Sequence, residues 1–352
     1  MLKYSSKDFV KNLSKEKYSG FYLGADVGGT STRLAVAGIK NNKPYIIFTL
    51  EYKTSSIKSI IPAIKETLNY ANKKHLINVR AACIGSAGII SDSNTSVKLT
   101  NAEWSISKKE ISDKTCINDV FLINDFKALG YGVSFLDIKS EKDIFKIREN
   151  KHLGFETKAV IGAGTGLGKS ILVYDEKTGS YKPLASEGGN SDFPYYNDFE
   201  ERLVKYIKNL RNISKPLVYE EILSGRGIEG IYQFLAEEYN EEKKYNTAEL
   251  ISKNKYDDEK CKKTFELFSK FYGRCAKNFA LETLCKGGLY IAGGIAAKNK
   301  EIFNSKHFID EFRNGNRREE FLKNVPIYIV LNPYTSLIGA CYVSMIMSMK
   351  DE

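Results

Sequence analysis

The most informative stretch of the sequence is Ala163-Gly164-Thr165-Gly166-Leu167-Gly168-Lys169-Ser170, which differs by one residue from a P-loop. A P-loop has the pattern Gly-x-x-x-x-Gly-Lys-Ser/Thr and lies between a strand and a helix, where backbone N–H groups bind phosphate. Here alanine replaces the first glycine, and residues 170–174 (Ser-Ile-Leu-Val-Tyr) have the composition of a strand. Residues 159–161, before the glycines, are also strand-like. The stretch therefore predicts a strand–turn–strand unit and not a strand–loop–helix unit.

A second stretch has the same construction. Residues 21–25 form a strand pattern that leads into Asp26-Val27-Gly28-Gly29-Thr30, and residues 33–38 continue as another strand. Glycines let backbone N–H groups come close to a phosphate, and threonine adds a hydroxyl donor. Two such turns predict a duplicated unit with one phosphate-binding hairpin in each of two domains. The alternative is a pair of ordinary β-turns.

The composition is that of a globular protein with a basic surface of mixed charge. At 352 residues the chain is long enough for two domains with separate cores. The net charge is +10, but basic residues are interleaved with acidic ones, which predicts a solvated surface and no nucleic-acid binding. Six cysteines without a Cys-x-x-Cys pair favour a cytoplasmic location and argue against structural zinc. No secretory signal or membrane-spanning stretch is recognisable, so no membrane partner is expected.

Polar residues that can do chemistry follow one of the strand patterns. Residues 120–123 form a buried-type strand that runs directly into Asn124 and Asp125, before a helix pattern at 127–132. In open α/β sheets ligands bind at the carboxyl ends of strands, so this pair is the candidate reacting centre. A carboxylate beside an amide can bind a polyol and accept a hydroxyl proton. The alternative is an ordinary helix N-cap, a position that Asn and Asp favour.

Other segments are candidates for ligand contacts. The turn at 186–190 (Ser-Glu-Gly-Gly-Asn) brings the carboxylate of Glu187 together with flexible backbone, and a later strand pattern ends in Gly293 and Gly294. Glu220 precedes a polar, glycine-containing segment, but alone it could equally be a solvated helix position.

Further features are assigned to structure and not to chemistry. The aromatic residues of the long amphipathic pattern at 261–284 are expected in a core. The apolar stretch 337–347 contains Gly339, which suits a helix packed closely on protein. None of the three histidines has a sequence context typical of a catalytic or metal-binding site.

Six short motifs occur in order along the chain. In one-letter code they are DVGGT at 26–30, INDF at 123–126, GAGTGLG at 162–168, EGG at 187–189, LSG at 223–225 and IAGG at 291–294. Together they resemble the motifs of the bacterial-type glucokinase family, within the sugar kinase/actin/Hsp70 ATPase superfamily, and the resemblance covers residues 22–342, nearly the whole chain. Each motif is modest alone, and their order makes the signal specific.

The resemblance implies an α/β protein with the two-domain actin-like ATPase (ribonuclease H-like) fold and an active site in the interdomain cleft. It implies a smaller domain at residues 21–135, a larger domain at 136–333 and a C-terminal helix at 334–350 that packs back on the smaller domain. Residues 1–20 are then an N-terminal extension. The implied partners are small molecules and a second copy of the chain in a homodimer.

The resemblance also implies a reaction, the transfer of the γ-phosphoryl group of ATP to the 6-hydroxyl of glucose. Asp125 would be the catalytic general base. The residues expected to bind the sugar are Asn124, Asp125, Glu187, Asn190 and Glu220. The family usually has histidine where this chain has Asn190, and asparagine is shorter and cannot become charged. Altered affinity or specificity for the hexose is therefore expected.

ATP and Mg²⁺ are the implied cofactors. The residues expected to bind the nucleotide are Asp26, Gly28, Gly29, Thr30, Gly164, Thr165, Gly166, Gly293 and Gly294. The two glycine turns would clamp the phosphates from two domains, and Gly293 and Gly294 would let adenosine approach the backbone. Asp26 would hold Mg²⁺ through a water molecule.

Three other functions have to be compared with this one. A kinase for another hexose has the same motifs. Asn190, in place of the family histidine, is the residue that could change the preference from glucose to another hexose. A non-catalytic sugar sensor of the same fold is disfavoured by Asp125 and because about twenty residues before the first predicted strand are too few for a helix-turn-helix domain. An actin- or Hsp70-like ATPase explains the glycine turns but not Glu187 and Glu220.

Overall fold

The computed structural model describes residues 3–91, 93–99, 104–150 and 155–349, and the chain divides into two compact units. Unit 1 contains the described residues up to Asp137, residues 181–183 and the described residues from Asn332 onward. Unit 2 contains the described residues of 138–180 and 184–331. A mixed six-stranded sheet and a large hydrophobic core organise each unit.

Unit 1 is built on a sheet with the strand order β1-β4-β3-β2-β5-β9. Its strands are β1 (Ser5–Asp8), β2 (Phe21–Val27), β3 (Ser31–Lys40), β4 (Lys43–Lys53), β5 (Ala81–Ser86) and β9 (Asp119–Asn124). β2, β3 and β4 are antiparallel neighbours, whereas β2, β5 and β9 run parallel. Asn41 and Asn42 connect β3 to β4 with positive φ, as a type I′ two-residue turn requires. β1 pairs with β4, so the prediction that the first strand begins near residue 21 is wrong.

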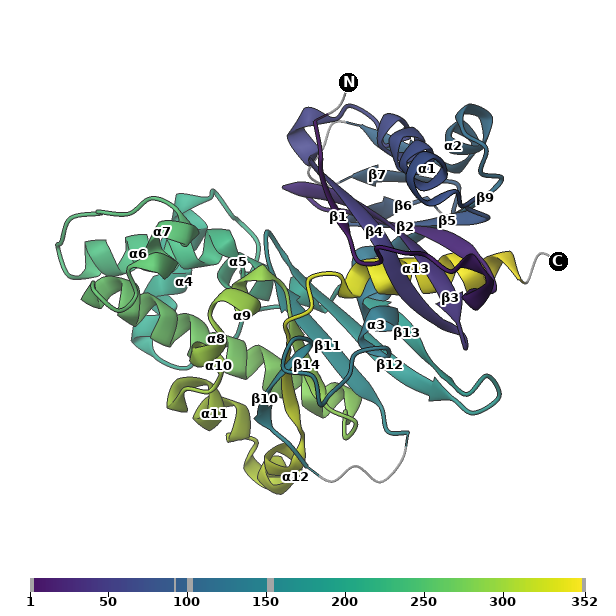
Figure 1. The fold of residues 1–352 in the computed structure, drawn as a ribbon. Coiled ribbons are helices and arrows are strands. Elements are labelled where there is room, and N and C mark those ends of the chain that lie inside the picture. The colour runs from purple at the N-terminus through teal and green to yellow at the C-terminus, as the bar shows by residue number, and fades with distance from the viewer. Residues whose placement is uncertain (1–2, 92, 100–103, 151–154, 350–352) are drawn as a thin grey trace. The chain divides into compact units, whose positions relative to one another are not determined.

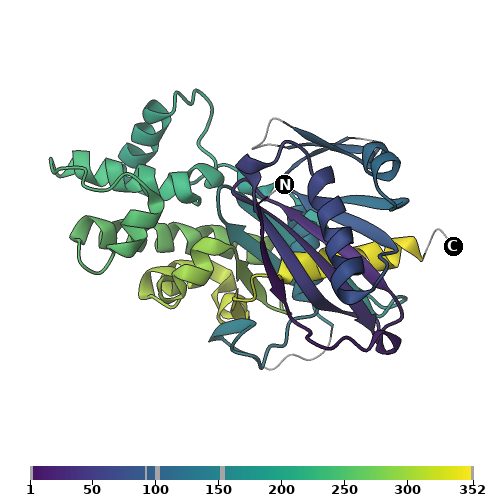
Figure 2. The same ribbon diagram turned by 45° about the horizontal axis from the view of Figure 1, so that its top comes forward.

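Helices pack on both faces of this sheet (Figures 1 and 2). α1 (Ile61–His75) shares a core with one face. α3 (Asp125–Val133) and α13 (Thr335–Ser348) share cores with the other face and contact each other. A Cβ added at Gly339 would lie 1.8 Å from the Ala128 carbonyl oxygen, so glycine permits this close approach of α13 to α3.

Smaller elements complete unit 1. They are the strands β6 (Gly88–Ile90), β7 (Ser96–Leu99) and β8 (Ser105–Ser107), the helix α2 (Lys108–Lys114), and the 3-10 turns η1 (Lys15–Lys17) and η2 (Thr54–Ser56). β6, β7 and β8 form a separate antiparallel sheet.

Unit 2 is built on the sheet β10-β15-β14-β11-β12-β13. Its strands are β10 (Ile144–Arg148), β11 (Lys158–Ala163), β12 (Leu167–Asp175), β13 (Ser180–Ser186), β14 (Leu289–Ala292) and β15 (Ile327–Val330). β11 and β12 are antiparallel, which confirms the strand–turn–strand prediction for the near-P-loop stretch. β11, β14 and β15 run parallel, so β11 and β14 both carry their carboxyl ends to the same edge of the sheet.

Helices form most of the rest of unit 2 (Figure 1). They are α4 (Asp198–Leu210), α5 (Tyr219–Ile222), α6 (Gly225–Glu238), α7 (Ala248–Lys253), α8 (Glu259–Thr283), α9 (Gly294–Lys298), α10 (Lys300–Phe303), α11 (Lys306–Arg313) and α12 (Glu319–Asn324), with the 3-10 turns η3 (Gly188–Asn190) and η4 (Asn316–Arg318). Asp258 is the N-cap of α8, and its carboxylate accepts a hydrogen bond from the Cys261 amide. The aromatic residues of α8 are buried, which confirms their assignment to a core.

Candidate functional site

The hairpin turn of unit 1 is closed by backbone hydrogen bonds. The Gly28 amide donates to the Ser31 carbonyl at 3.0 Å, and the Thr54 amide donates to the Thr30 carbonyl at 3.0 Å. The Thr54 hydroxyl also donates to the Gly28 carbonyl at 2.7 Å. Residues of η2 thus hold the Gly28-Gly29-Thr30 turn, and Thr30 at its tip is exposed.

Asp26 lies on β2 directly opposite Arg33 of β3. The Arg33 guanidinium donates to the Asp26 carboxylate at 2.6 Å and to the Pro333 carbonyl at 2.7 Å. Within the described ranges, no group of three or more His, Cys, Asp or Glu residues could hold a metal ion. A lone carboxylate nevertheless fits Mg²⁺ in a nucleotide site, because the ion takes one or two carboxylates and completes its shell with phosphate oxygens and water.

Asn124 and Asp125 lie at the junction between β9 and α3. The Asn124 Oδ1 atom accepts hydrogen bonds from the Phe126 amide at 2.9 Å and the Lys127 amide at 3.2 Å, so Asn124 is the N-cap of α3. Asp125 occupies the first helical position. The N-cap alternative is therefore confirmed for Asn124, while its Nδ2 group takes no part in the cap.

The strand register of unit 1 brings these two features to one edge of the sheet. Val27, at the end of β2, pairs with Ser86, and Ser86 pairs with Asn124. The three strands are parallel, so the Gly28 turn and Asp125 both follow carboxyl ends at the same edge. This is the edge at which α/β sheets bind ligands.

The hairpin turn of unit 2 is exposed at Gly164 and Thr165. The Gly164 amide donates to the Gly166 carbonyl at 2.8 Å, and the Gly225 amide donates to the Gly164 carbonyl at 2.9 Å. Ser224 caps α6 by accepting a hydrogen bond from the Gly227 amide. The first residue of α6 therefore stabilises this turn through a backbone hydrogen bond.

Glu220 contacts the turn directly. Its Oε2 atom accepts a hydrogen bond from the Leu167 amide at 2.9 Å. A Cβ added at Gly166 would lie 2.5 Å from the same oxygen, so glycine makes space for the carboxylate. The interpretation of Glu220 as a merely solvated helix position is wrong.

The turn that contains Glu187 packs against Leu167. The Asn190 amide donates to the Glu187 carbonyl at 2.9 Å, and the Asn190 side chain reaches the Glu187 carboxylate at 3.5 Å. A Cβ added at Gly189 would lie 1.9 Å from the Leu167 carbonyl oxygen, which only glycine allows. Leu167 thus contacts both segments: its amide bonds to Glu220, and its carbonyl oxygen lies against Gly189 of the Glu187 turn.

Gly293 and Gly294 follow β14, next to the same hairpin. Gly293 has φ of +92°, a conformation that favours glycine, and a Cβ there would lie 2.5 Å from the Ala163 carbonyl oxygen. Gly294 begins α9, and a Cβ there would have no described atom within 4 Å. The residues predicted in unit 2 therefore gather around the β11–β12 turn.

Several contacts of the site have no sequence signal. Thr54 and Arg33 hold the unit 1 hairpin and its carboxylate, yet neither belongs to a motif. Lys169 is buried in β12, with its ammonium group 5.0 Å from the ring centre of Phe279 and 5.6 Å from that of Tyr219. Lys169 lies in the near-P-loop stretch, but the sequence assigned it no role in the site.

The structure also places the histidines and shows whether any helix could span a membrane. His75 stacks on Phe48 and contacts Asp8 at 2.9 Å, so it has a packing role. His307 lies 3.8 Å from Glu266, and His152 lies outside the described residues. Throughout the described part of the chain, every helix is too short or too polar to cross a membrane.

Comparisons with known proteins identify the family of the chain. The glucokinase family model matches residues 23–346. A glucokinase from Trichormus variabilis is 33% identical over 341 residues, which cover 90% of this chain and 97% of that protein. The crystal structure of a glucokinase from an Antarctic psychrotroph has a TM-score of 0.77 at 26% identity, covering 93% of this chain and 99% of that chain.

A second solved structure shares the fold at lower identity. The glucokinase from Balamuthia mandrillaris, solved in complex with glucose, has a TM-score of 0.80 at 23% identity, covering 93% of this chain and 94% of that chain. The mixed sheets and the two glycine hairpins are those of the actin-like ATPase fold that such kinases share. The chain belongs to the glucokinase family and is a sugar kinase.

Proposed function

We propose that the protein transfers the γ-phosphoryl group of ATP to the 6-hydroxyl of glucose, giving ADP and glucose 6-phosphate. The observation that carries the proposal is the contact of Glu220 and the Glu187 turn with Leu167, directly beside the Gly164–Gly166 turn. An ATPase that acts without a sugar needs the glycine turn, but it needs neither the Glu220 carboxylate bonded to Leu167 nor the Glu187 loop packed beside it. Acidic side chains next to a phosphate-type turn are what a kinase of a polyhydroxyl substrate requires.

Asp125 is the proposed general base. Its carboxylate takes the proton of the sugar 6-hydroxyl as that oxygen attacks the γ-phosphorus, and the bond from phosphorus to the oxygen bridging to the β-phosphate breaks. Phosphoryl transfer asks the protein mainly for positioning and charge stabilisation, with a base that orients the nucleophile. The place of Asp125 in the first turn of α3, at the ligand-binding edge of the sheet, supports this role.

The remaining side chains are proposed to bind the hexose hydroxyls. Glu187 and Glu220 would accept hydrogen bonds, and Asn124 can donate through the Nδ2 group that its helix cap leaves unused. Asn190 lies against Glu187, so it can both orient that carboxylate and contact a hydroxyl. The complex of the Balamuthia glucokinase with glucose supports glucose as the first substrate to test.

The nucleotide is proposed to bind at the two glycine turns. Backbone N–H groups near Gly28 and Gly164 would contact phosphate oxygens, and Gly293 would let adenosine approach. Asp26 would hold Mg²⁺ through water, with Arg33 fixing the carboxylate from the other side. The ion would supply charge neutralisation at the β- and γ-phosphates.

Location and assembly are proposed from the chain's chemistry. All six cysteines are free and five of them are buried, which suits a reducing compartment such as the cytoplasm. The homodimer remains a prediction, and light scattering of the purified protein would determine the mass of the assembly.

The test is ADP release from Mg-ATP with glucose, mannose, fructose, N-acetylglucosamine or no sugar. We expect glucose-dependent turnover, and we expect Asp125→Asn to lower kcat by about 10²–10⁴-fold with the fold intact, since a general base is lost. Asp113→Asn is the matched control, because Asp113 is an exposed carboxylate of α2 in the same unit. Hydrolysis indifferent to sugar would contradict the proposal, and preference for another hexose would make Asn190 the first residue to change.

A further inference from the structure

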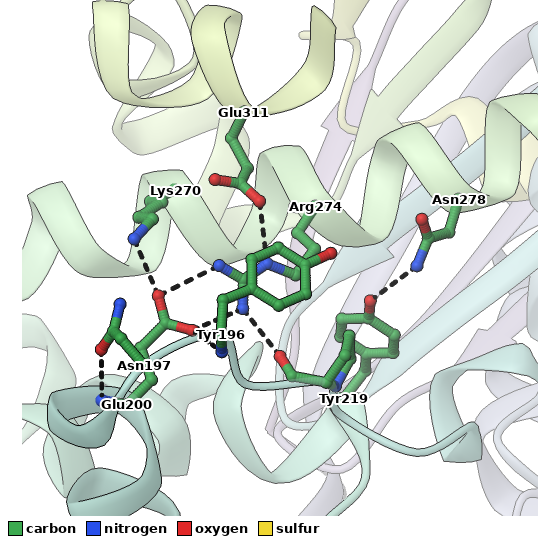
Figure 3. Close-up of polar contacts among 9 residues, drawn as sticks. Tyr196, Asn197, Glu200, Tyr219, Lys270, Arg274, Asn278 and Glu311 are labelled. Atoms are coloured by element: carbon green, nitrogen blue, oxygen red, sulfur yellow. Dashed lines mark hydrogen bonds and ion pairs between the residues drawn. The ribbon is translucent and has the colours of Figure 1, made fainter. Parts of the chain in front are cut away.

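The segment at residues 191–197 connects the Glu187 turn to α4 with one isolated bridge, at Asp192, as its only regular pairing. The backbone groups of such a segment must find partners outside a sheet or helix. The partner of the Pro194 carbonyl is Arg274, on a face of α8 drawn in Figure 3. Lys270, Arg274 and Asn278 are spaced by four residues, so their side chains share that face.

Arg274 is fully buried at 0% exposure. Its guanidinium donates to the Pro194 carbonyl at 2.7 Å, to both Glu200 oxygens at 2.8 and 3.0 Å, and to Glu311 at 2.8 Å. The Tyr196 ring covers it, with the guanidinium carbon 3.7 Å from the ring centre. A single arginine thus joins α8, α4 and α11 to the segment that follows the Glu187 turn.

Glu200 completes the hold on this segment. It accepts hydrogen bonds from Arg274, from Lys270 at 2.7 Å and from the Tyr196 amide at 2.9 Å. Burial alone would raise the pKa of the Glu200 carboxyl, but these hydrogen bonds outweigh burial and lower the pKa to about 2. Two cations, Lys270 and Arg274, thus face two carboxylates, Glu200 and Glu311.

The next turn of α8 contacts the segment that contains Glu220. Asn278 donates its Nδ2 hydrogen to the Tyr219 hydroxyl at 3.0 Å, and the Tyr219 amide donates to the Ser191 carbonyl at 3.0 Å. Tyr219 directly precedes Glu220. The same face of α8 therefore contacts the segment that follows the Glu187 turn and the residue that precedes Glu220.

We propose that Arg274 and Asn278 are positioning residues that set the spacing between Glu187 and Glu220 and thereby control hexose affinity. The inference rests on the proposed function, in which those two glutamates bind the sugar. A purely stabilising role explains the cluster poorly, because apolar residues of similar volume often stabilise a protein core as well as a buried ion pair. The fixed fork of arginine instead specifies the geometry of three separate chain segments.

The experiment measures steady-state KM for glucose and for ATP in Arg274→Lys and Asn278→Ala. Lysine keeps the charge beside Glu200 but lacks the fork that also reaches Pro194 and Glu311. Asn278→Ala removes one hydrogen bond and leaves every charge in place. Arg202→Lys is the matched control, because Arg202 forms an exposed pair with Glu238 on the same unit.

We expect KM for glucose to rise about 10- to 100-fold in both variants, the effect of displacing a binding group by roughly 1 Å. KM for ATP should stay within twofold, and the control should match the wild type. An unchanged KM for glucose, or a loss of kcat alone in folded protein, would overturn the inference. If Arg274→Lys fails to fold, Asn278→Ala decides by the same criterion. Wild-type protein without hexose-dependent turnover would instead contradict the proposed function itself, and the inference with it.

Discussion

Leu167 uses its two backbone groups for different parts of the candidate site. Its amide donates to Glu220, and its carbonyl oxygen faces Gly189 at a distance that excludes a Cβ. The side chain itself is buried in the core of unit 2. One residue at the start of β12 therefore fixes two loops relative to the glycine turn, by main-chain groups that every residue type except proline has.

Gly166→Ala tests this arrangement. The added Cβ would lie 2.5 Å from the Glu220 Oε2 atom, so the carboxylate must move and lose its hydrogen bond to Leu167. We expect KM for glucose to rise by about tenfold, because one lost hydrogen bond to a charged group lowers the binding free energy by about 1.5 kcal/mol. The measurement is steady-state kinetics of Gly166→Ala, Glu220→Asp and the double variant. The shorter aspartate makes room for the Cβ, so the double variant should be less impaired than the sum of the single changes, and strict additivity would contradict the proposed contact.

At the scale of secondary-structure elements, the hairpins were the easiest features to predict. Their signals are local, since Gly28 and Gly164 lie between strand patterns a few residues long. β1 could not be predicted in the same way, because its four exposed residues, Ser-Ser-Lys-Asp, have no apolar alternation and pair with a strand about forty residues away.

The contacts within the site were also beyond sequence patterns. Glu220 and Leu167 are separated by 53 positions, and nothing in either segment indicates the other. Local patterns indicated Asp125 and Glu187 as candidates, and the resemblance implied their roles. The Thr54 and Arg33 contacts depend on strand register, which becomes visible only once the strands are paired.

The contact between α3 and α13 yields a stability prediction. Glycine to alanine in a helix usually stabilises by about 1 kcal/mol. At Gly339 the sign should reverse, because the Cβ would lie 1.8 Å from the Ala128 carbonyl oxygen, a backbone atom that cannot rotate away. We expect Gly339→Ala to destabilise by about 1–3 kcal/mol, the usual cost of overpacking. Urea denaturation measures it, with Ser336→Ala on the same helix as the control. A stabilised Gly339→Ala would show that the two helices are not in this close contact.

For the whole molecule, the buried carboxylate Glu200 predicts how stability depends on pH. Its pKa is lowered to about 2 in the folded protein, below the ordinary value near 4.5. The stability that this carboxylate contributes is therefore present above about pH 4.5 and is lost as the pH falls toward 2. Denaturation curves between pH 6 and pH 3 should show a shallower loss of stability for Glu200→Gln than for the wild type. Glu249→Gln, which changes an exposed carboxylate, should keep the wild-type slope. Equal slopes for all three proteins would contradict the assignment of the titrating group.

The place of α13 has a consequence for the order in which the chain can fold during synthesis. The ribosome makes β2, β3 and β5 early, but the face of their sheet that contains Ala35, Ala37 and Cys83 is covered by α13. Between these strands and that helix lies the whole of the described part of unit 2. α3 is made earlier and packs on the same face, but the part under α13 stays exposed in nascent unit 1 until residues 138–331 have been translated. Unit 1 begins first but can complete its fold only after unit 2 has been made. A chaperone would be needed most while unit 2 is being translated.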